Sequence, residues 1–151
     1  MIAEAGPEAI DAIMEIMEQA FDPNYGEAWN RAQCLGILGL PGVWMSLAFR
    51  DGTVGGFALG RVVLDDAELL LIAVKPLWRG QGLGQRLLDD VVRAAGGRGA
   101  SRLHLEVRDG NPALALYRGN GFEPIGRRKD YYTGSLGQTY DALTLTRPIS
   151  G

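Results

Sequence analysis

A run of glycines stands directly before a helical pattern in the stretch WRGQGLGQRLLDDVVRAA, residues 78–95. Gly80, Gly82 and Gly84 follow Arg79, and glycines let a phosphate approach the backbone because they carry no Cβ atom. The free N–H groups and the dipole at the start of a helix also favour negative charge. The spacing differs from that of a P-loop and from the Rossmann fingerprint. The turn is therefore a candidate phosphate site, unless its glycines serve only the packing of a helix on a strand.

The segments before this turn predict two helices followed by a β-hairpin. Residues 7–20 carry apolar side chains at helical spacing behind a proline, which predicts an amphipathic helix. Residues 27–38 predict a weaker helix that is interrupted by Gly36. The stretches 43–50 and 53–64 flank an Asp-Gly pair and predict the two strands of the hairpin.

The segments on either side of the glycines predict a strand that leads into a helix. Residues 67–74 form a nearly continuous apolar run, which is typical of a central strand covered on both faces. After the glycines, apolar side chains from Leu83 to Ala95 follow one helical face, while polar and charged side chains occupy the other. We therefore expect this helix to pack on the sheet.

The last third of the chain predicts a strand, a short helix and two closing strands. Residues 101–107 alternate as a strand, and Asn111 and Pro112 have the types expected of a helix cap and a first helical residue. Residues 121–132 and 138–146 predict the closing strands. The order α, α, β, β, β, α, β, α, β, β predicts a mixed α/β fold with antiparallel hairpins at both ends.

Composition narrows the class of protein and of partner. The 151 residues, 46% of them hydrophobic, predict a single domain over residues 1–151. A net charge of -3 argues against nucleic acid or an anionic membrane as the main partner and favours a basic one. Cys34 and His104 are the only cysteine and histidine, so we expect neither a disulfide nor a metal site. The acidic, periodic N-terminus resembles neither a signal peptide nor a membrane span, and we expect a cytoplasmic location.

Two blocks of the sequence resemble a known family. Residues 72–88, IAVKPLWRGQGLGQRLL, resemble the acetyl-CoA motif of the GNAT superfamily of N-acetyltransferases, Arg/Gln-x-x-Gly-x-Gly/Ala. Residues 103–132 and 140–150 resemble the RimI type of that superfamily, the acetyltransferases of ribosomal-protein N-terminal alanine. The resemblance covers residues 43–150 and implies the GNAT fold, a central mixed and mostly antiparallel sheet flanked by helices.

The resemblance also implies roles for individual residues. Glu106, in Leu-Glu-Val-Arg, takes the place of the family's general base, and Tyr117, in Leu-Tyr, takes that of its general acid. The spacing from Asn111 to Tyr117 is one residue shorter than is usual for the type. The intervening helix could therefore start at a different position, which affects the role of Asn111 more than that of Tyr117. β-strand backbone would bind the pantetheine arm of acetyl-CoA, and backbone amides of the turn its pyrophosphate. The cofactor residues implied in this way are Ile72, Ala73, Val74, Arg79, Gly80, Gln81, Gly82, Leu83, Gly84, Gln85 and Asn111.

Acetyl transfer from a thioester to an amine requires these same two groups. An α-amino group with a pKa of about 8 is mostly charged at pH 7, so a carboxylate such as Glu106 has a proton to remove. A thiolate leaves more easily when a hydroxyl protonates it, and a tyrosine with a pKa near 10, such as Tyr117, can donate that proton. Each residue also has a structural interpretation, Glu106 as a solvated carboxylate and Tyr117 as a core tyrosine. Tyr131 and Tyr132 could line the acceptor slot, or could be aromatic residues at a strand end.

Together, these features predict an N-acetyltransferase that passes acetyl directly from acetyl-CoA to a protein N-terminal amine, without a metal. The expected acceptor is a basic N-terminus, with the N-terminal alanine of a ribosomal protein as the first candidate. Residues 21–42 and 127–139 should shape the acceptor side, but their pattern is the least readable. Two alternatives stay open: acetylation of lysine side chains or of a small-molecule amine, and a non-catalytic module that binds acyl-CoA.

Overall fold

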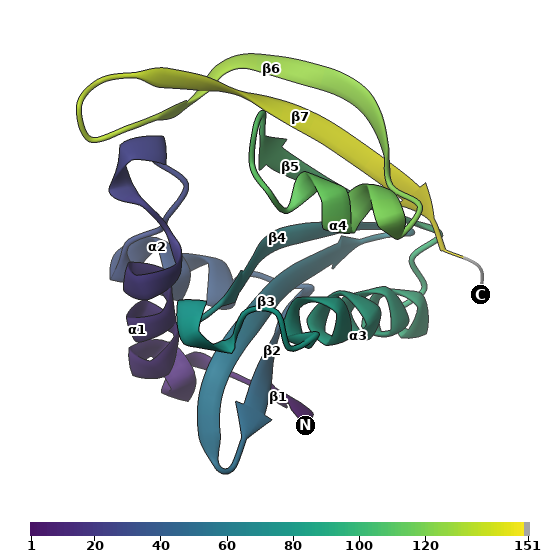
Figure 1. The fold of residues 1–151 in the computed structure, drawn as a ribbon. Coiled ribbons are helices and arrows are strands. Elements are labelled where there is room, and N and C mark those ends of the chain that lie inside the picture. Colours follow the sequence, from purple (N-terminus) through teal and green to yellow (C-terminus); the bar gives the residue numbers. More distant parts are fainter. Residues whose placement is uncertain (150–151) are drawn as a thin grey trace.

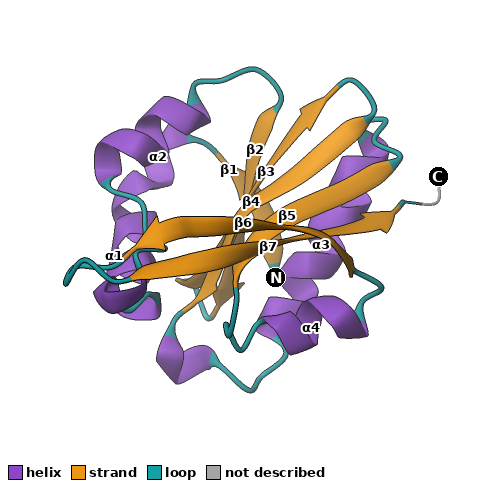
Figure 2. Cartoon of the chain, turned by 90° about the horizontal axis from the view of Figure 1, so that it is seen from above, coloured by secondary structure: helices purple, strands orange, loops and turns teal. Residues whose placement is uncertain are grey.

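The computed structural model describes residues 1–149 as a seven-stranded sheet with helices on both faces (Figures 1 and 2). The helices are α1 (Ile10–Ala20), α2 (Arg31–Leu38), α3 (Leu83–Gly97) and α4 (Leu114–Gly119), with short 3-10 turns at η1 (Pro7–Ala9), η2 (Pro23–Tyr25) and η3 (Pro76–Trp78). The strands are β1 (Ile2–Ala5), β2 (Val43–Arg50), β3 (Thr53–Val63), β4 (Asp66–Val74), β5 (Arg102–Arg108), β6 (Glu123–Thr133) and β7 (Thr139–Pro148).

The strand order is β1-β2-β3-β4-β5-β7-β6, and every neighbouring pair is antiparallel except β4 and β5. This parallel pair extends only over Asp66–Leu69 and Arg102–Leu105. Beyond these residues the C-terminal half of β4 and the end of β5 separate, as Figure 1 shows. The sheet therefore opens in its middle, at the ends of both strands.

Each face of the sheet has its own apolar core. On one face, α3 buries the stripe that its sequence pattern predicts against residues of β4, β5 and β7, including Leu69, Leu105 and Leu145. On the other face, α1 packs Ile13 and Ile16 against β2 and β3. Apolar burial of this kind contributes roughly 25 cal/mol per Å2 and holds the helices to the sheet. Among the described residues, no helix is both long and apolar enough to span a bilayer.

Most of the predicted elements are confirmed. The helix predicted over residues 7–20 is present, with η1 as its first turn. The β2–β3 hairpin turns at Asp51 and Gly52, whose φ values of 52° and 77° are those of a type I′ turn. The apolar run that leads into the glycines is β4, and the helix after them is α3. The two closing strands are β6 and β7.

Three features of the first 40 residues differ from the prediction. The strand β1 was not predicted, because its four residues include Glu4 and only its pairing with β2 defines it. The second helix begins at Arg31 rather than at residue 27. Asn30 forms a capping box with Gln33 in which each side chain accepts from the other residue's backbone N–H at 2.8 Å. Gly36 lies inside α2 and does not interrupt it.

Two further differences lie beside the opening in the sheet. Leu70, Leu71 and Ile72 are only partly buried, so the prediction that β4 is covered on both faces is wrong at its C-terminal half. The side-chain oxygen of Asn111 accepts from the Ala113 N–H at 2.8 Å, as a cap would, but α4 itself starts two residues later than predicted.

The strand β6 forms one edge of the sheet and pairs only with β7. Its register with β7 shifts twice, between Pro124 and Gly126 and between Arg128 and Tyr132. Asp130 has a φ of 53° within the second irregular stretch. The strand is exposed along almost its whole length.

Candidate functional site

The separation of β4 from β5 opens into a cavity of about 770 Å3. Volumes of this order are typical of small-molecule sites. Its lining comes from the C-terminal half of β4, the glycine turn, β5, α4, the segment after α1 and the end of β6. All of the predicted site residues line it except Gln81 and Gln85. The fold thus brings together residues that the sequence separates by more than 100 positions.

The glycine turn presents unpaired backbone donors to this cavity. Among residues 1–149, none accepts a hydrogen bond from the N–H groups of residues 80–85, and the first bonded N–H is that of Arg86, to the Gly82 carbonyl at 3.1 Å. Gly80 and Gly82 have φ values of 77° and 81°, which favour glycine. A Cβ atom at either position would meet no other atom within 4 Å. Close packing of helix on strand therefore does not account for these two glycines.

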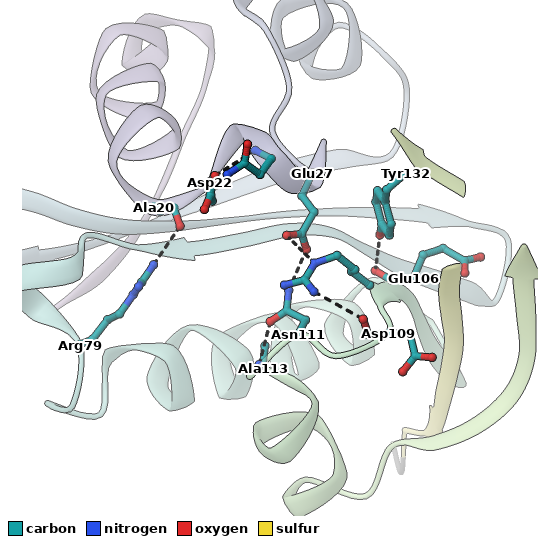
Figure 3. Close-up of polar contacts among 11 residues, drawn as sticks. Ala20, Asp22, Glu27, Arg79, Glu106, Asp109, Asn111, Ala113 and Tyr132 are labelled. Carbon is teal, nitrogen blue, oxygen red and sulfur yellow. Dashed lines mark hydrogen bonds and ion pairs between the residues drawn. The ribbon is translucent and has the colours of Figure 1, made fainter. Parts of the chain in front are cut away.

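The polar side chains of the turn form hydrogen bonds with other residues of the protein. Arg79 donates from Nη2 to the Ala20 carbonyl at 3.0 Å (Figure 3). Gln81 contacts Arg50, and Gln85 bonds the Asn120 side chain at 2.7 Å. The contribution of the turn to the cavity is therefore mainly its backbone.

The C-terminal half of β4 contributes a free strand edge. Ile72, Ala73 and Val74 pair with β3 on one side, but the pairing with β5 on the other side ends at Leu69. The backbone groups that face the cavity have no strand partner there. Such an edge can bind an extended ligand through main-chain hydrogen bonds.

Glu106 lies on β5 with its side chain only 12% exposed. Its Oε2 accepts from the Thr144 hydroxyl at 2.7 Å, and its Oε1 lies 3.0 Å from Nε of Arg128. The Arg128 side chain is 62% exposed, so solvent screens this ion pair. Glu106 is thus an anchored carboxylate at the cavity wall and not a freely solvated one.

Tyr117 lies on α4 with its ring buried and packed edge-on against Phe122, at a centroid distance of 5.7 Å. None of the side-chain hydrogen bonds of residues 1–149 involves its hydroxyl, although the residue lines the cavity. Burial, and secondly the negative charge of Glu27, raise the pKa of Tyr117 well above its usual value. The phenol therefore stays protonated and can act as a donor.

Tyr131 and Tyr132 also reach the cavity, from the end of β6. Their rings pack edge-on at 4.9 Å, and the Tyr132 hydroxyl donates to the Glu106 carbonyl at 3.5 Å (Figure 3). Burial is the main cause that raises the pKa of Tyr132, followed by the charge of Glu27. Tyr132 thus lies beside the predicted base, and Tyr131 packs against Tyr132.

Among the lining residues that sequence reasoning missed is a cluster formed by Tyr25, Glu27 and Arg108. Glu27 is a single acidic residue at the start of the helix predicted over residues 27–38, and no motif marked it as part of a site. Arg108 belongs to the Leu-Glu-Val-Arg motif, which gave the only available hint. Glu27 accepts from the amide of Asn111 at 2.8 Å, so both polar atoms of that side chain are bonded within the protein (Figure 3).

Metal ligands do not gather in the part of the chain that the structure describes, where no three His, Cys, Asp or Glu side chains form a group. His104 lies beside Asp66, with Nδ1 and Oδ1 3.4 Å apart. Cys34 is buried in the core between α2 and the sheet, and burial raises the pKa of its thiol. Neither residue lines the cavity.

Comparison with known sequences identifies relatives. A family model described as the acetyltransferase (GNAT) family matches residues 10–122. The ribosomal protein bS18-alanine N-acetyltransferase of Escherichia coli strain K12 is 41% identical over 102 residues, which are 67% of this chain and 68% of that protein. A Bacillus subtilis relative is 45% identical over 85 residues, and this match spans only 56% of each chain.

The likeness extends to the three-dimensional structure. The crystal structure of the ribosomal-protein-S18-alanine N-acetyltransferase from Escherichia coli superposes with a TM-score of 0.88 at 32% identity, covering 100% of this chain and 94% of that one. The predicted fold, a mixed and mostly antiparallel sheet flanked by helices, is thereby confirmed. The chain belongs to the acetyltransferase (GNAT) family.

Proposed function

We propose that this chain transfers acetyl from acetyl-CoA to the N-terminal α-amine of a basic protein, with a ribosomal protein that begins with alanine as the first candidate. The observation that supports the proposal most is that one cavity contains three groups: the glycine turn with its unpaired backbone N–H groups, the carboxylate of Glu106 and the protonated phenol of Tyr117. The name of the Escherichia coli relative supports the choice of acceptor. We further propose that residues 1–151 act as one cytoplasmic domain.

The residues present suit acetyl-CoA, which would supply an activated acetyl thioester. The free N–H groups of residues 80–85 would bind its pyrophosphate, because they stand at the start of α3, where the helix dipole favours negative charge. The free edge at Ile72, Ala73 and Val74 would bind the extended pantetheine arm by main-chain hydrogen bonds. No metal is part of this scheme.

Two side chains then have defined tasks in the proposed reaction. Glu106 accepts a proton from the acceptor amine, directly or through water, so that the neutral amine can attack the acetyl carbonyl carbon. The hydroxyl of Tyr117 donates a proton to the departing sulfur. A module that only binds acyl-CoA would need neither side chain, which favours the enzyme over that alternative. Tyr131 and Tyr132 would flank the amine beside Glu106.

The role of the turn can be tested with two glycines in the same strained conformation. Gly82 and Gly99 have φ values of 81° and 89°, and a Cβ atom at either would meet nothing within 4 Å. Gly82→Ala should weaken acetyl-CoA binding by about tenfold or more, because the new methyl group enters the phosphate site. Calorimetry measures the affinity, and Gly99→Ala is the matched control for backbone strain. Equal affinities in the two variants would make the turn structural only.

Tyr117→Phe should lower kcat by roughly 10²- to 10⁴-fold, the range for a lost general acid, and leave acetyl-CoA affinity unchanged. The fold should tolerate the change, because no side-chain hydrogen bond within residues 1–149 involves this hydroxyl and the residue lines the cavity. Steady-state assay of released thiol gives kcat, and thermal unfolding checks the fold. Wild-type turnover in a folded variant would remove Tyr117 from the mechanism.

Glu106→Gln should lower the rate most at neutral pH and progressively less at higher pH. The reason is that an α-amine with a pKa of about 8 is already mostly neutral above that pH and needs no base. The ratio of wild-type to variant rate, measured from pH 6.5 to 9.5, should therefore fall as pH rises. A ratio that stays constant over this range would show that Glu106 does not deprotonate the amine.

The acceptor is tested with three substrates and mass spectrometry. A peptide that begins with alanine and carries downstream arginines should be acetylated at its terminus much faster than the same peptide with a blocked terminus and an internal lysine. An α-amine has a pKa about two to three units below that of lysine, so more of it is neutral at a given pH. Preferred modification of the lysine peptide, or of a small polyamine, would replace the proposed acceptor class with another.

A further inference from the structure

A buried ion pair lies at the end of the cavity where Glu106 and Tyr132 are found. Oε1 of Glu27 lies 3.1 Å from Nε of Arg108, and the two side chains are only 11% and 9% exposed. The second carboxylate oxygen of Glu27 accepts from the Asn111 amide at 2.8 Å. Figure 3 shows Glu27 at this end, away from the contact between Arg79 and Ala20 at the other.

The Arg108 guanidinium is held by more than this one carboxylate. It lies over the ring of Tyr25, 3.7 Å from the ring centroid, and the ring of Tyr140 packs edge-on against that of Tyr25 at 5.3 Å. Cation–π contacts of this kind gain strength when the cation is removed from water. Because an unpaired buried charge is unfavourable, Glu27 and Arg108 depend on each other.

The segment that carries Glu27 also packs closely against the β6–β7 hairpin. A Cβ atom on Gly26 would lie 2.0 Å from the Thr133 carbonyl oxygen, and one on Gly134 would lie 1.9 Å from the Asn24 carbonyl oxygen. The N–H of Ser135 donates to the Pro23 carbonyl at 3.1 Å. The segment between α1 and α2 therefore bridges two walls of the cavity, with β5 and α4 on one side and the hairpin on the other (Figure 1).

We propose that Glu27 is a positioning residue for the acceptor: through Arg108 and Asn111 it fixes the segment 22–30 as the wall of the acceptor slot. We call Glu27 and its two partners, Arg108 and Asn111, the clamp. The identity of the acceptor rests on the proposed function, but the clamp itself does not depend on it. Asn111 acts in the clamp through its amide. Glu27 does not serve as the base. A proton on its carboxylate would leave the buried Arg108 cation unpaired, whereas a proton on Glu106 would leave Arg128, whose side chain is exposed to water.

The kinetic test compares Glu27→Ala, Glu27→Gln and the control Glu18→Gln, which changes an exposed carboxylate on α1 outside the cavity. Glu27→Ala should raise the acceptor KM by about tenfold or more, because both hydrogen bonds are lost. Glu27→Gln should have a smaller effect, because an amide oxygen can still accept one of them. The values of kcat and of acetyl-CoA affinity should stay within about threefold of wild type. A loss confined to kcat would overturn the proposal and make Glu27 a catalytic residue.

A second measurement needs no acceptor. The Ser135 N–H is bonded across the bridge, so its hydrogen exchange reports whether the segment stays in place. Exchange at Ser135 should be faster in Glu27→Ala than in wild type, and unchanged in Glu18→Gln. Unchanged exchange in Glu27→Ala would overturn the clamp, whatever the acceptor. If wild type acetylates no N-terminal peptide, the acceptor assignment fails while this measurement still decides the clamp. Should Glu27→Ala not fold, Glu27→Gln serves in both measurements.

Discussion

The site depends on one limit in the pairing of the sheet: β4 and β5 are hydrogen-bonded only as far as Leu69 and Leu105. A parallel pair that continued to the ends of both strands would satisfy its backbone groups and close the sheet. Because the pairing stops, β4 keeps a free edge, while β5 stays paired with β7 along its whole length, with Glu106 on it. The turn before α3 and the helix α4 then stand on opposite sides of the same opening, so the cavity results from the pairing of the sheet.

The sequence predicted the elements whose signals are local. The Asp-Gly hairpin, the apolar stripe of α3 and the alternation of β5 were all recognisable, because each follows from propensity or periodicity within a few residues. The strand β1 was not, since four residues with one glutamate carry no pattern until β2 lies beside them. The C-terminal half of β4 was misjudged for a related reason. An apolar run shows that side chains avoid water, but Leu70 and Ile72 can do so by lining a cavity as well as by lying under a helix.

The residues of the candidate site also fall into two groups, those that the sequence predicted and those that it did not. Gly82, Glu106 and Tyr117 belong to motifs whose order along the chain resembles that of a family, and the structure gathers all three around one cavity. Glu27 has no such motif, and its importance comes from Arg108, which lies 81 residues away in the sequence. A buried carboxylate in a loop can be recognised only when its counter-ion is known. Long-range ion pairs of this kind are what single-sequence reasoning cannot find.

The exposed strand β6 has a consequence for how copies of this chain meet. An unpaired strand edge offers backbone hydrogen bonds to any other strand, and a long, regular one promotes self-association. Here the two register shifts and the positive φ of Asp130 break the row of donors and acceptors into short pieces. The irregularities of β6 thus help to keep the edge of the sheet from joining molecules into aggregates.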